Sequence, residues 1–117
     1  MARLSTHVLD TARGVAAQGI AIEVHVVHGD DRQRVASAVT NADGRTDAPL
    51  LSGDRLEPGV YELSFHVGEY FTRTGVAVTK PPFLDVIVLR VGLADPHGSY
   101  HVPLLLSPYG YSTYRGT

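Results

Sequence analysis

Residues Val60-Tyr-Glu-Leu-Ser-Phe-His-Val67 decide the fold class of this chain. Apolar residues occupy every second position from Tyr61 to Val67, and polar residues from Glu62 to His66 fill the positions between them. A period of two is typical of a strand with one buried and one solvated face. The stretch therefore predicts a half-buried antiparallel strand.

Three further stretches also fit strands. β-Branched residues alternate over Ile20–Val27, and a similar pattern covers Val35–Thr40. Leu84–Val91 is apolar at nearly every position, which predicts a central strand that is covered on both faces. Short strands spaced in this way predict two antiparallel sheets packed face to face.

Turn-forming residues separate these strands. Asn41–Gly44, Glu57–Gly59 and Pro81–Pro82 each provide a fixed or a positive φ where the chain must reverse. The one plausible helix, Gly68–Thr74, is a short connector. The sequence therefore predicts an all-β sandwich of seven or eight strands with one short helix, in a single domain over residues 1–117.

Composition excludes several function classes. The 117 residues carry a net charge of −2, which favours neither nucleic acid nor an anionic membrane as a partner. The chain has no cysteine, so a disulfide framework and a thiolate nucleophile are excluded. No apolar run approaches the roughly 18 residues of a membrane span, and the first residues lack a signal-peptide pattern. A cytoplasmic location is expected.

Four of the six histidines are expected to be structural or exposed: His25, His28 and His66 lie in strand patterns, and His97 lies in a turn. The three-residue offset between His25 and His28 places their side chains on opposite faces of a strand. No metal site and no cofactor are therefore expected, although a metal site assembled across strands stays open.

His7 and His101 differ in context, because each lies in a run that is otherwise apolar or hydroxyl-bearing. Each must find a hydrogen-bond partner or face a cavity. Taken alone, each is more commonly a structural histidine, and Arg45, after the Asp43-Gly44 turn, is more commonly an exposed turn residue. The C-terminal stretch 111–117 contains two tyrosines, which suggests that it packs against another part of the protein or against a ligand.

Together four motifs resemble the transthyretin-like family, in its branch of ring-opening hydrolases, and the resemblance spans Leu4 to Thr117. The motifs are Leu4-Ser-Thr-His-Val-Leu-Asp10, Asp43-Gly-Arg45, Tyr100-His-Val-Pro-Leu-Leu-Leu-Ser-Pro108 and Tyr111-Ser-Thr-Tyr-Arg-Gly-Thr117.

The resemblance implies a transthyretin-like β-sandwich of about eight strands and one short helix. It also implies a homotetramer, built as a dimer of dimers, with active sites at the dimer–dimer interface. The implied reaction is the hydrolysis of 5-hydroxyisourate to 2-oxo-4-hydroxy-4-carboxy-5-ureidoimidazoline in urate degradation, with a small-molecule substrate and no cofactor.

The residues that match the family's site are catalytic His7, Arg45 and His101, which would also bind substrate, together with the substrate-binding tail Tyr114, Arg115, Gly116 and Thr117. The two histidines would divide the roles of general base and proton donor, and which takes which role stays open. Family members commonly carry a histidine where this chain has Ser99, and a terminal serine where it has Thr117.

Two rival functions remain. A non-enzymatic carrier of a small aromatic ligand would use the same fold, but it needs an apolar channel rather than two imidazoles and an arginine. A bare interaction module would explain the fold and leave those residues unexplained.

Overall fold

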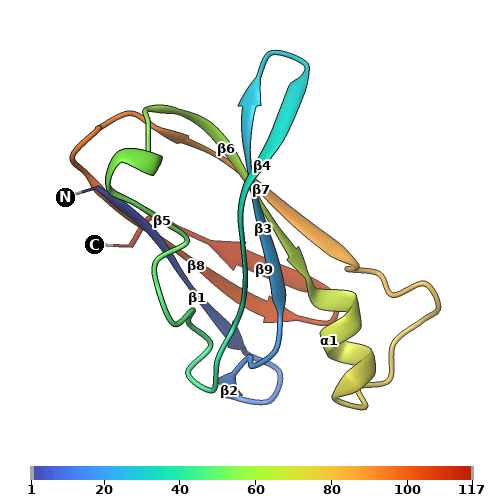
Figure 1. The fold of residues 1–117 in the computed structure, drawn as a ribbon. Helices are drawn as coiled ribbons and strands as arrows, with labels where there is room; N and C mark the ends of the chain where they lie inside the picture. Colours follow the sequence, from blue (N-terminus) through green and yellow to red (C-terminus); the bar gives the residue numbers. More distant parts are fainter. Residues whose placement is uncertain (1, 117) are drawn as a thin grey trace.

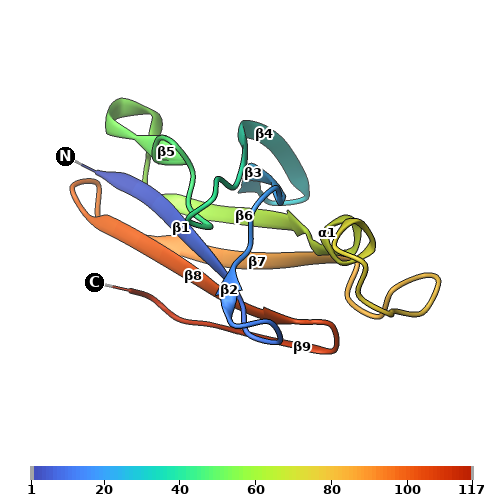
Figure 2. The same cartoon turned by 90° about the horizontal axis from the view of Figure 1, so that it is seen from below.

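The computed structural model describes residues 2–116, which form two packed sheets (Figures 1 and 2). The first sheet has the order β2-β1-β8-β9, with β5 also paired to β1. Its strands are β1 (Arg3–Asp10), β2 (Val15–Ala16), β5 (Leu51–Ser52), β8 (Ser99–Ser107) and β9 (Gly110–Thr113). The second sheet has the order β4-β3-β6-β7, with β3 (Ala21–His28), β4 (Asp31–Val39), β6 (Gly59–His66) and β7 (Val86–Leu93).

The predicted fold class is confirmed. All strand pairs are antiparallel except β1 and β8, which run parallel over their full length. Among residues 2–116 there are nine strands, of which β2 and β5 have two residues each. The expected number was about eight strands, so the count agrees to within these short strands. The helices are a 3₁₀ turn, η1 (Gly53–Arg55), and α1 (Val67–Arg73), and no helix in this part of the chain could span a membrane.

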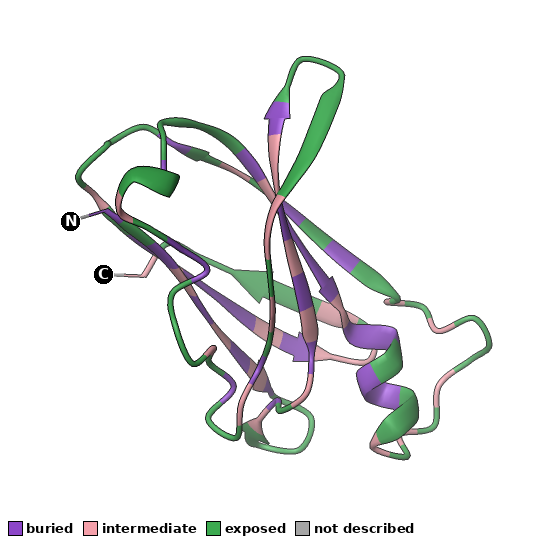
Figure 3. Ribbon diagram, viewed as in Figure 1, coloured by how far each residue is buried: buried purple, intermediate pink, exposed green. Residues whose placement is uncertain are grey.

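The core lies between the sheets and follows the predicted alternation. Tyr61, Leu63 and Phe65 of β6 are buried, as the pattern of two predicts (Figure 3). They share one apolar cluster with residues of the opposite sheet, including Leu4 and Leu104. Burial of such side chains is worth roughly 1.5–3 kcal/mol each and holds the two layers together.

The prediction for Leu84–Val91 was wrong in one respect. The strand, β7, begins at Val86 and is an edge of its sheet rather than a central strand. Ile87 and Leu89 are buried, whereas Val86 and Val88 are 44% and 46% exposed on the other face. The apolar run therefore reflects an apolar outer face, which this chain alone leaves uncovered.

The pairing of β3 with β4 shifts between Val24 and His25, and the extra residue at this β-bulge is Val35 of β4. The pairing of β3 with β6 continues without a shift, so the alternation along β3 is kept. Val26 is partly buried against the core, and Val27 on the other face of the strand is buried as well.

Helix α1 covers one end of the sandwich, within one residue of the predicted span (Figure 1). Tyr70 and Phe71 are buried, and the Tyr70 hydroxyl donates to the Asp10 carboxylate at 2.8 Å. A side chain at Gly68 would collide with Asp85, whose backbone carbonyl accepts from the Gly68 N–H. The helix is thereby fixed both to the end of β1 and to the segment before β7.

Candidate active site

The parallel pairing of β1 and β8 brings the candidate residues together. In register, Ser5 lies beside His101 and Arg3 lies beside Ser99. Alternation along β1 buries Leu4 and turns the odd-numbered side chains to the outer face of the sheet. Two segments that are far apart in the sequence therefore present one row of polar groups.

These groups line a cavity of about 440 Å³, which we call the β1–β8 cleft; its lining residues are Arg3, Ser5, Arg45, Ser99, Tyr100 and His101. A smaller hollow of about 210 Å³ adjoins it and shares Arg3, Ser5 and Arg45. Small-molecule sites commonly occupy about 300–1,000 Å³ and carry a few well-placed polar groups. The β1–β8 cleft has the size and polarity of such a site.

His101 is half-buried and oriented by Ser5. The Ser5 Oγ and the His101 Nδ1 are 2.9 Å apart and share a hydrogen bond. Burial, and then the positive charges of Arg45, His7 and Arg3, lower the pKa of the His101 imidazole. A lowered pKa keeps the ring neutral at pH 7, and the bond at Nδ1 leaves Nε2 as the nitrogen available to a ligand.

His7 lies on the same face of β1, two residues beyond Ser5. Its Nε2 is 2.9 Å from the backbone carbonyl of Asp43. A carbonyl only accepts, so Nε2 carries the proton and Nδ1 is the free nitrogen. His7 does not line the β1–β8 cleft, although its charge acts on His101.

Arg45 reaches the cleft from a turn that is fastened to β1. The Asn41 Oδ1 accepts from the N–H groups of Asp43 and Arg45, at 2.9 and 3.2 Å. Gly44 has a φ of +74°, and its carbonyl accepts from the Val8 N–H at 2.8 Å. A Cβ at Gly44 would collide with the Val8 carbonyl, so the turn needs glycine both for its conformation and for its closeness to β1.

Part of the C-terminal tail contacts the other side of His101. The Gly116 N–H donates to the His101 carbonyl at 2.7 Å, and the two residues form an isolated antiparallel bridge. A Cβ on Gly116 would lie 2.7 Å from the His101 Cδ2. Glycine is required at this position because the tail backbone lies against the imidazole.

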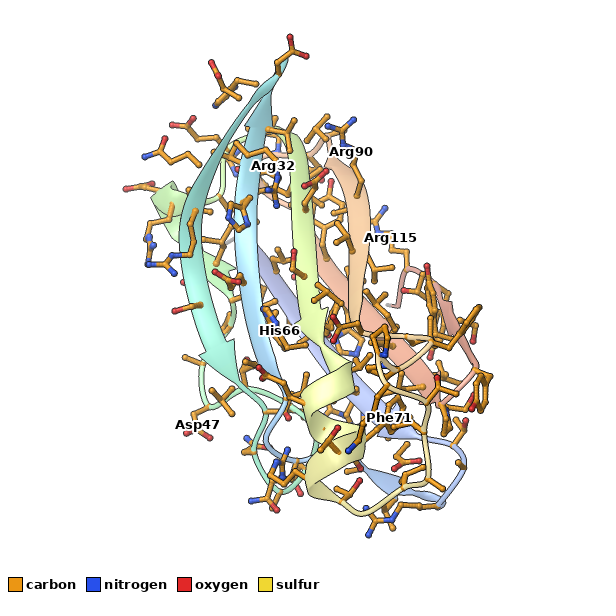
Figure 4. The ribbon with its side chains drawn as sticks, turned by 90° about the vertical axis from the view of Figure 1, so that its right-hand side faces the viewer. Arg32, Asp47, His66, Phe71, Arg90 and Arg115 are labelled. Atoms are coloured by element: carbon orange, nitrogen blue, oxygen red, sulfur yellow. The ribbon has the colours of Figure 1, made fainter. Side chains whose placement is uncertain are left out.

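The structure does not bring Tyr114 and Arg115 into the β1–β8 cleft. They line a separate cavity of about 330 Å³ that β7 and β9 also border. The Arg115 guanidinium lies 4.4 Å from the centre of the Tyr100 ring, a cation–π contact. In Figure 4, Arg115 lies beside the edge strand β7, on the opposite side from Asp47 of the adjoining hollow. Thr117 lies outside the described residues.

Sequence reasoning did not name Arg3 and Ser5. Both sit at odd positions of β1, on the same face as His7, and this alternation is the signal that could have found them. Their place beside His101 in the lining of the cleft depends on a long-range strand pairing, which no local pattern specifies.

Other polar groups of residues 2–116 lie away from the β1–β8 cleft. In the part of the chain that the structure describes, no three His, Cys, Asp or Glu side chains lie close enough together to hold a metal ion. A hollow of about 420 Å³ on the other sheet is lined in part by Glu23, Arg34 and His66. There the Glu23 carboxylate accepts from both neighbours, at 3.0 Å from His66 and 3.3 Å from Arg34, so the charges are largely matched.

The chain belongs to the transthyretin family, because the sequence model of the HIUase/Transthyretin family matches residues 4–116. Within this family its relatives include 5-hydroxyisourate hydrolases. It is 53% identical to 5-hydroxyisourate hydrolase 2 of Rhizobium meliloti, over 98% of this chain and 96% of that protein. It is 55% identical to the 5-hydroxyisourate hydrolase of Deinococcus radiodurans, over 97% of this chain and 95% of that one.

Solved structures agree on the fold. The 5-hydroxyisourate hydrolase of Klebsiella pneumoniae has a TM-score of 0.82 at 32% identity and covers both chains fully. Transthyretin from Sparus aurata has a TM-score of 0.87 at 29% identity, over 97% of this chain and 96% of its own. An (S)-allantoin synthase has a TM-score of 0.93 at 43% identity; the alignment covers 99% of this chain but only 44% of the synthase.

Proposed function

We propose that this protein is an enzyme that hydrolyses 5-hydroxyisourate to 2-oxo-4-hydroxy-4-carboxy-5-ureidoimidazoline. The observation that carries the proposal is near full-length identity of 53% and 55% to two 5-hydroxyisourate hydrolases. The β1–β8 cleft, which combines an oriented imidazole with two guanidinium groups, suits a hydrolysis of a cyclic amide bond. The reaction would belong to urate degradation.

His101 is proposed to activate the attacking water. A general base must be unprotonated at working pH and must point a free nitrogen at the water. The lowered pKa of His101 supports the first condition, and the Ser5 hydrogen bond supports the second.

His7 would then supply a proton to the nitrogen that leaves. Its Nε2 proton is committed to the Asp43 carbonyl, so a proton for the substrate would come from Nδ1 when the ring is charged. His7 is absent from the lining of the β1–β8 cleft within one chain, so this role requires the larger pocket of an assembled protein.

Arg45 is proposed to hold the carbonyl oxygen on which negative charge develops. Its guanidinium stays protonated at all relevant pH values and its planar fork matches paired acceptors. A preorganised cation at a developing oxyanion is commonly worth about 10²- to 10³-fold in rate.

The tail residues Tyr114, Arg115, Gly116 and Thr117 are proposed to close the pocket around the substrate. The bridge between Gly116 and His101 supports this role for the tail backbone. Tyr114 and Arg115 line the other cavity of this chain, so their proposed contact is with substrate held between subunits.

The assembly proposed is a homotetramer with sites at the dimer–dimer interface. Strands β7 and β9 are both sheet edges, and they border one cavity of the sandwich. An open edge with exposed valines is a surface that a second copy can cover by strand pairing. We place the enzyme in the cytoplasm, with neither nucleic acid nor membrane as a partner.

A transthyretin-type carrier is the second candidate, and the similarity to transthyretin from Sparus aurata supports it. A carrier for an amphipathic aromatic ligand needs a mainly apolar channel. The polar lining of the β1–β8 cleft favours the enzyme over the carrier.

The test is ultraviolet absorbance of 5-hydroxyisourate, generated in place by urate oxidase, with wild-type protein and with His101→Asn and Arg45→Gln. We expect the wild type to accelerate decay and each variant to lose at least about 10²-fold in kcat/KM. The matched control is His97→Asn, in the exposed turn before β8, which should behave as wild type. No acceleration by a folded wild type would favour the carrier. Full activity of His101→Asn would remove that residue from the mechanism.

A further inference from the structure

Arg3 lines the β1–β8 cleft but has no role in the mechanism proposed above. It begins β1, two residues before Ser5, and it lines both the β1–β8 cleft and the adjoining hollow. Arg45 also lines both. The register partner of Arg3 is Ser99, which lines the β1–β8 cleft as well.

The charge of Arg3 has no carboxylate partner within the described chain. The ion pairs found among residues 2–116 use Arg32, Arg34, Arg90 and His66 as cations. Asp47, which lines the adjoining hollow, accepts from the Asn41 side chain at 3.0 Å and forms no ion pair with Arg3 or Arg45. Among residues 2–116 the cleft therefore carries two guanidinium groups that no carboxylate pairs with directly, which is an arrangement that binds anions.

Hydrolysis of a cyclic amide creates an anion. The oxygen of water forms a bond to the carbonyl carbon, and the bond from that carbon to the ring nitrogen breaks. One proton of the water goes to the nitrogen, and the other leaves when the new carboxylic acid ionises at neutral pH. A neutral carbonyl in the substrate thus becomes a carboxylate with two acceptor oxygens in the product.

We propose that Arg3 binds this newly formed carboxylate, while Arg45 holds the oxyanion that precedes it. The proposal rests on the hydrolase function and the site given above. A guanidinium recognises a carboxylate through two parallel hydrogen bonds, which a lysine cannot reproduce. Arg3 would then act late in the reaction and set how strongly the product is retained.

The same charge also acts on His101. The groups that face this imidazole are Ser5, His7 and Arg3 from β1, Arg45 from the turn, and Gly116 from the tail. After burial, the charges of Arg45, His7 and Arg3 lower the pKa of His101. Loss of the Arg3 charge should therefore move the acidic limb of the kcat/KM profile to higher pH, whereas a lysine at position 3 should leave it in place.

The experiment compares wild type, Arg3→Gln and Arg3→Lys by complete time courses of 5-hydroxyisourate decay, whose curvature gives the inhibition constant of the accumulating product. We expect the inhibition constant to rise about tenfold in Arg3→Gln and to rise in Arg3→Lys as well, because both lose the bidentate contact. Only Arg3→Gln should shift the pH profile.

Lys80→Gln is the matched control. It removes one positive charge from an exposed loop position between α1 and β7, at the opposite end of the molecule from the start of β1 (Figure 1). It should match wild type in product inhibition and in pH profile.

Two outcomes would overturn the proposal. If Arg3→Gln matches Lys80→Gln while Arg45→Gln and His101→Asn are impaired, the site stands and the role of Arg3 is wrong. If Arg3→Gln shifts the pH profile but leaves product inhibition unchanged, Arg3 acts only through its field and does not bind the carboxylate. Full activity in Arg45→Gln and His101→Asn would instead refute the site itself.

Discussion

Ser5 controls how His101 presents its ring to the cleft. A serine hydroxyl that occupies Nδ1, at 2.9 Å, fixes both the ring plane and the nitrogen left for chemistry. In the proposed mechanism Ser5 therefore acts as a positioning residue for His101, and its side chain also lines the cleft.

Ser5→Ala should lower kcat by about fivefold, because one hydrogen bond worth roughly 1 kcal/mol no longer holds the base. Ser5→Thr keeps the hydroxyl and should recover most of the loss. The urate oxidase-coupled absorbance assay measures both variants. Equal loss in Ser5→Ala and Ser5→Thr would point to packing rather than to the hydrogen bond.

Gly116 sets the distance between the tail and His101. In Gly116→Ala the new Cβ would lie 2.7 Å from the His101 Cδ2, so either the tail or the ring must move. We expect kcat/KM to fall at least about tenfold with the melting temperature almost unchanged, because a shift of about 1 Å in a catalytic group can cost 10²-fold. Gly110→Ala is the control, since its Cβ would meet only the Ser107 hydroxyl at 3.7 Å. Equal activity of the two variants would contradict a role for the tail.

At the scale of single residues, the sequence predicted only those members of the candidate site that lie in a recognisable motif. His7, Arg45 and His101 each stand out against their neighbours in the sequence, although none is decisive alone. Arg3 and Ser5 carry no local signal beyond their position on the strand. Their roles arise from the register with β8, which depends on the whole fold.

At the scale of elements, a buried hydrogen bond joins α1 to the strand that carries His7. The Tyr70 hydroxyl donates to the Asp10 Oδ2, and Asp10 Oδ1 accepts from the Arg13 N–H at 3.1 Å. Burial, and then the bond to Asp10, raise the pKa of Tyr70, which keeps the hydroxyl protonated as a donor. Asp10 is almost fully buried, so its carboxylate depends on these partners.

Tyr70→Phe should reduce the free energy of unfolding by about 1–3 kcal/mol, because it leaves a buried carboxylate oxygen without its donor. Urea denaturation followed by circular dichroism measures the change. Tyr111→Phe removes the same atom from a ring that is 46% exposed, and it should cost less than about 0.5 kcal/mol. If both variants were equally stable, the bond to Asp10 would contribute nothing.

Sequence patterns located the strands β3, β4, β6 and β7, but they did not give the environment of every one of them. The alternation in β6 gave the correct buried face because one side of that strand meets the core and the other meets charged neighbours. In β7 the outer positions Val86 and Val88 are apolar as well, so the pattern looked like that of a central strand. An edge strand with an apolar outer face has the same composition as a strand buried within its own chain.

For the molecule as a whole, assembly should control activity. If sites form between subunits, dilution that dissociates the tetramer will reduce the turnover per chain. We expect specific activity to fall in parallel with molecular mass, measured by mass photometry over the same concentrations. Val88→Lys, which places a charge on the exposed face of β7, should shift both curves to higher concentration. A monomer that keeps full turnover would contradict the interfacial site.

The parallel pairing of β1 and β8 has a consequence for how the protein is made. The hydrogen bond between Ser5 and His101 joins residues 96 positions apart, and all residues that line the cleft except Arg45 come from these two strands. During synthesis on the ribosome, β1 emerges first and can pair early with the short strands β2 and β5, but its full-length partner β8 follows only near the end of the chain. The cleft therefore forms late, after nearly all of the chain has been synthesised.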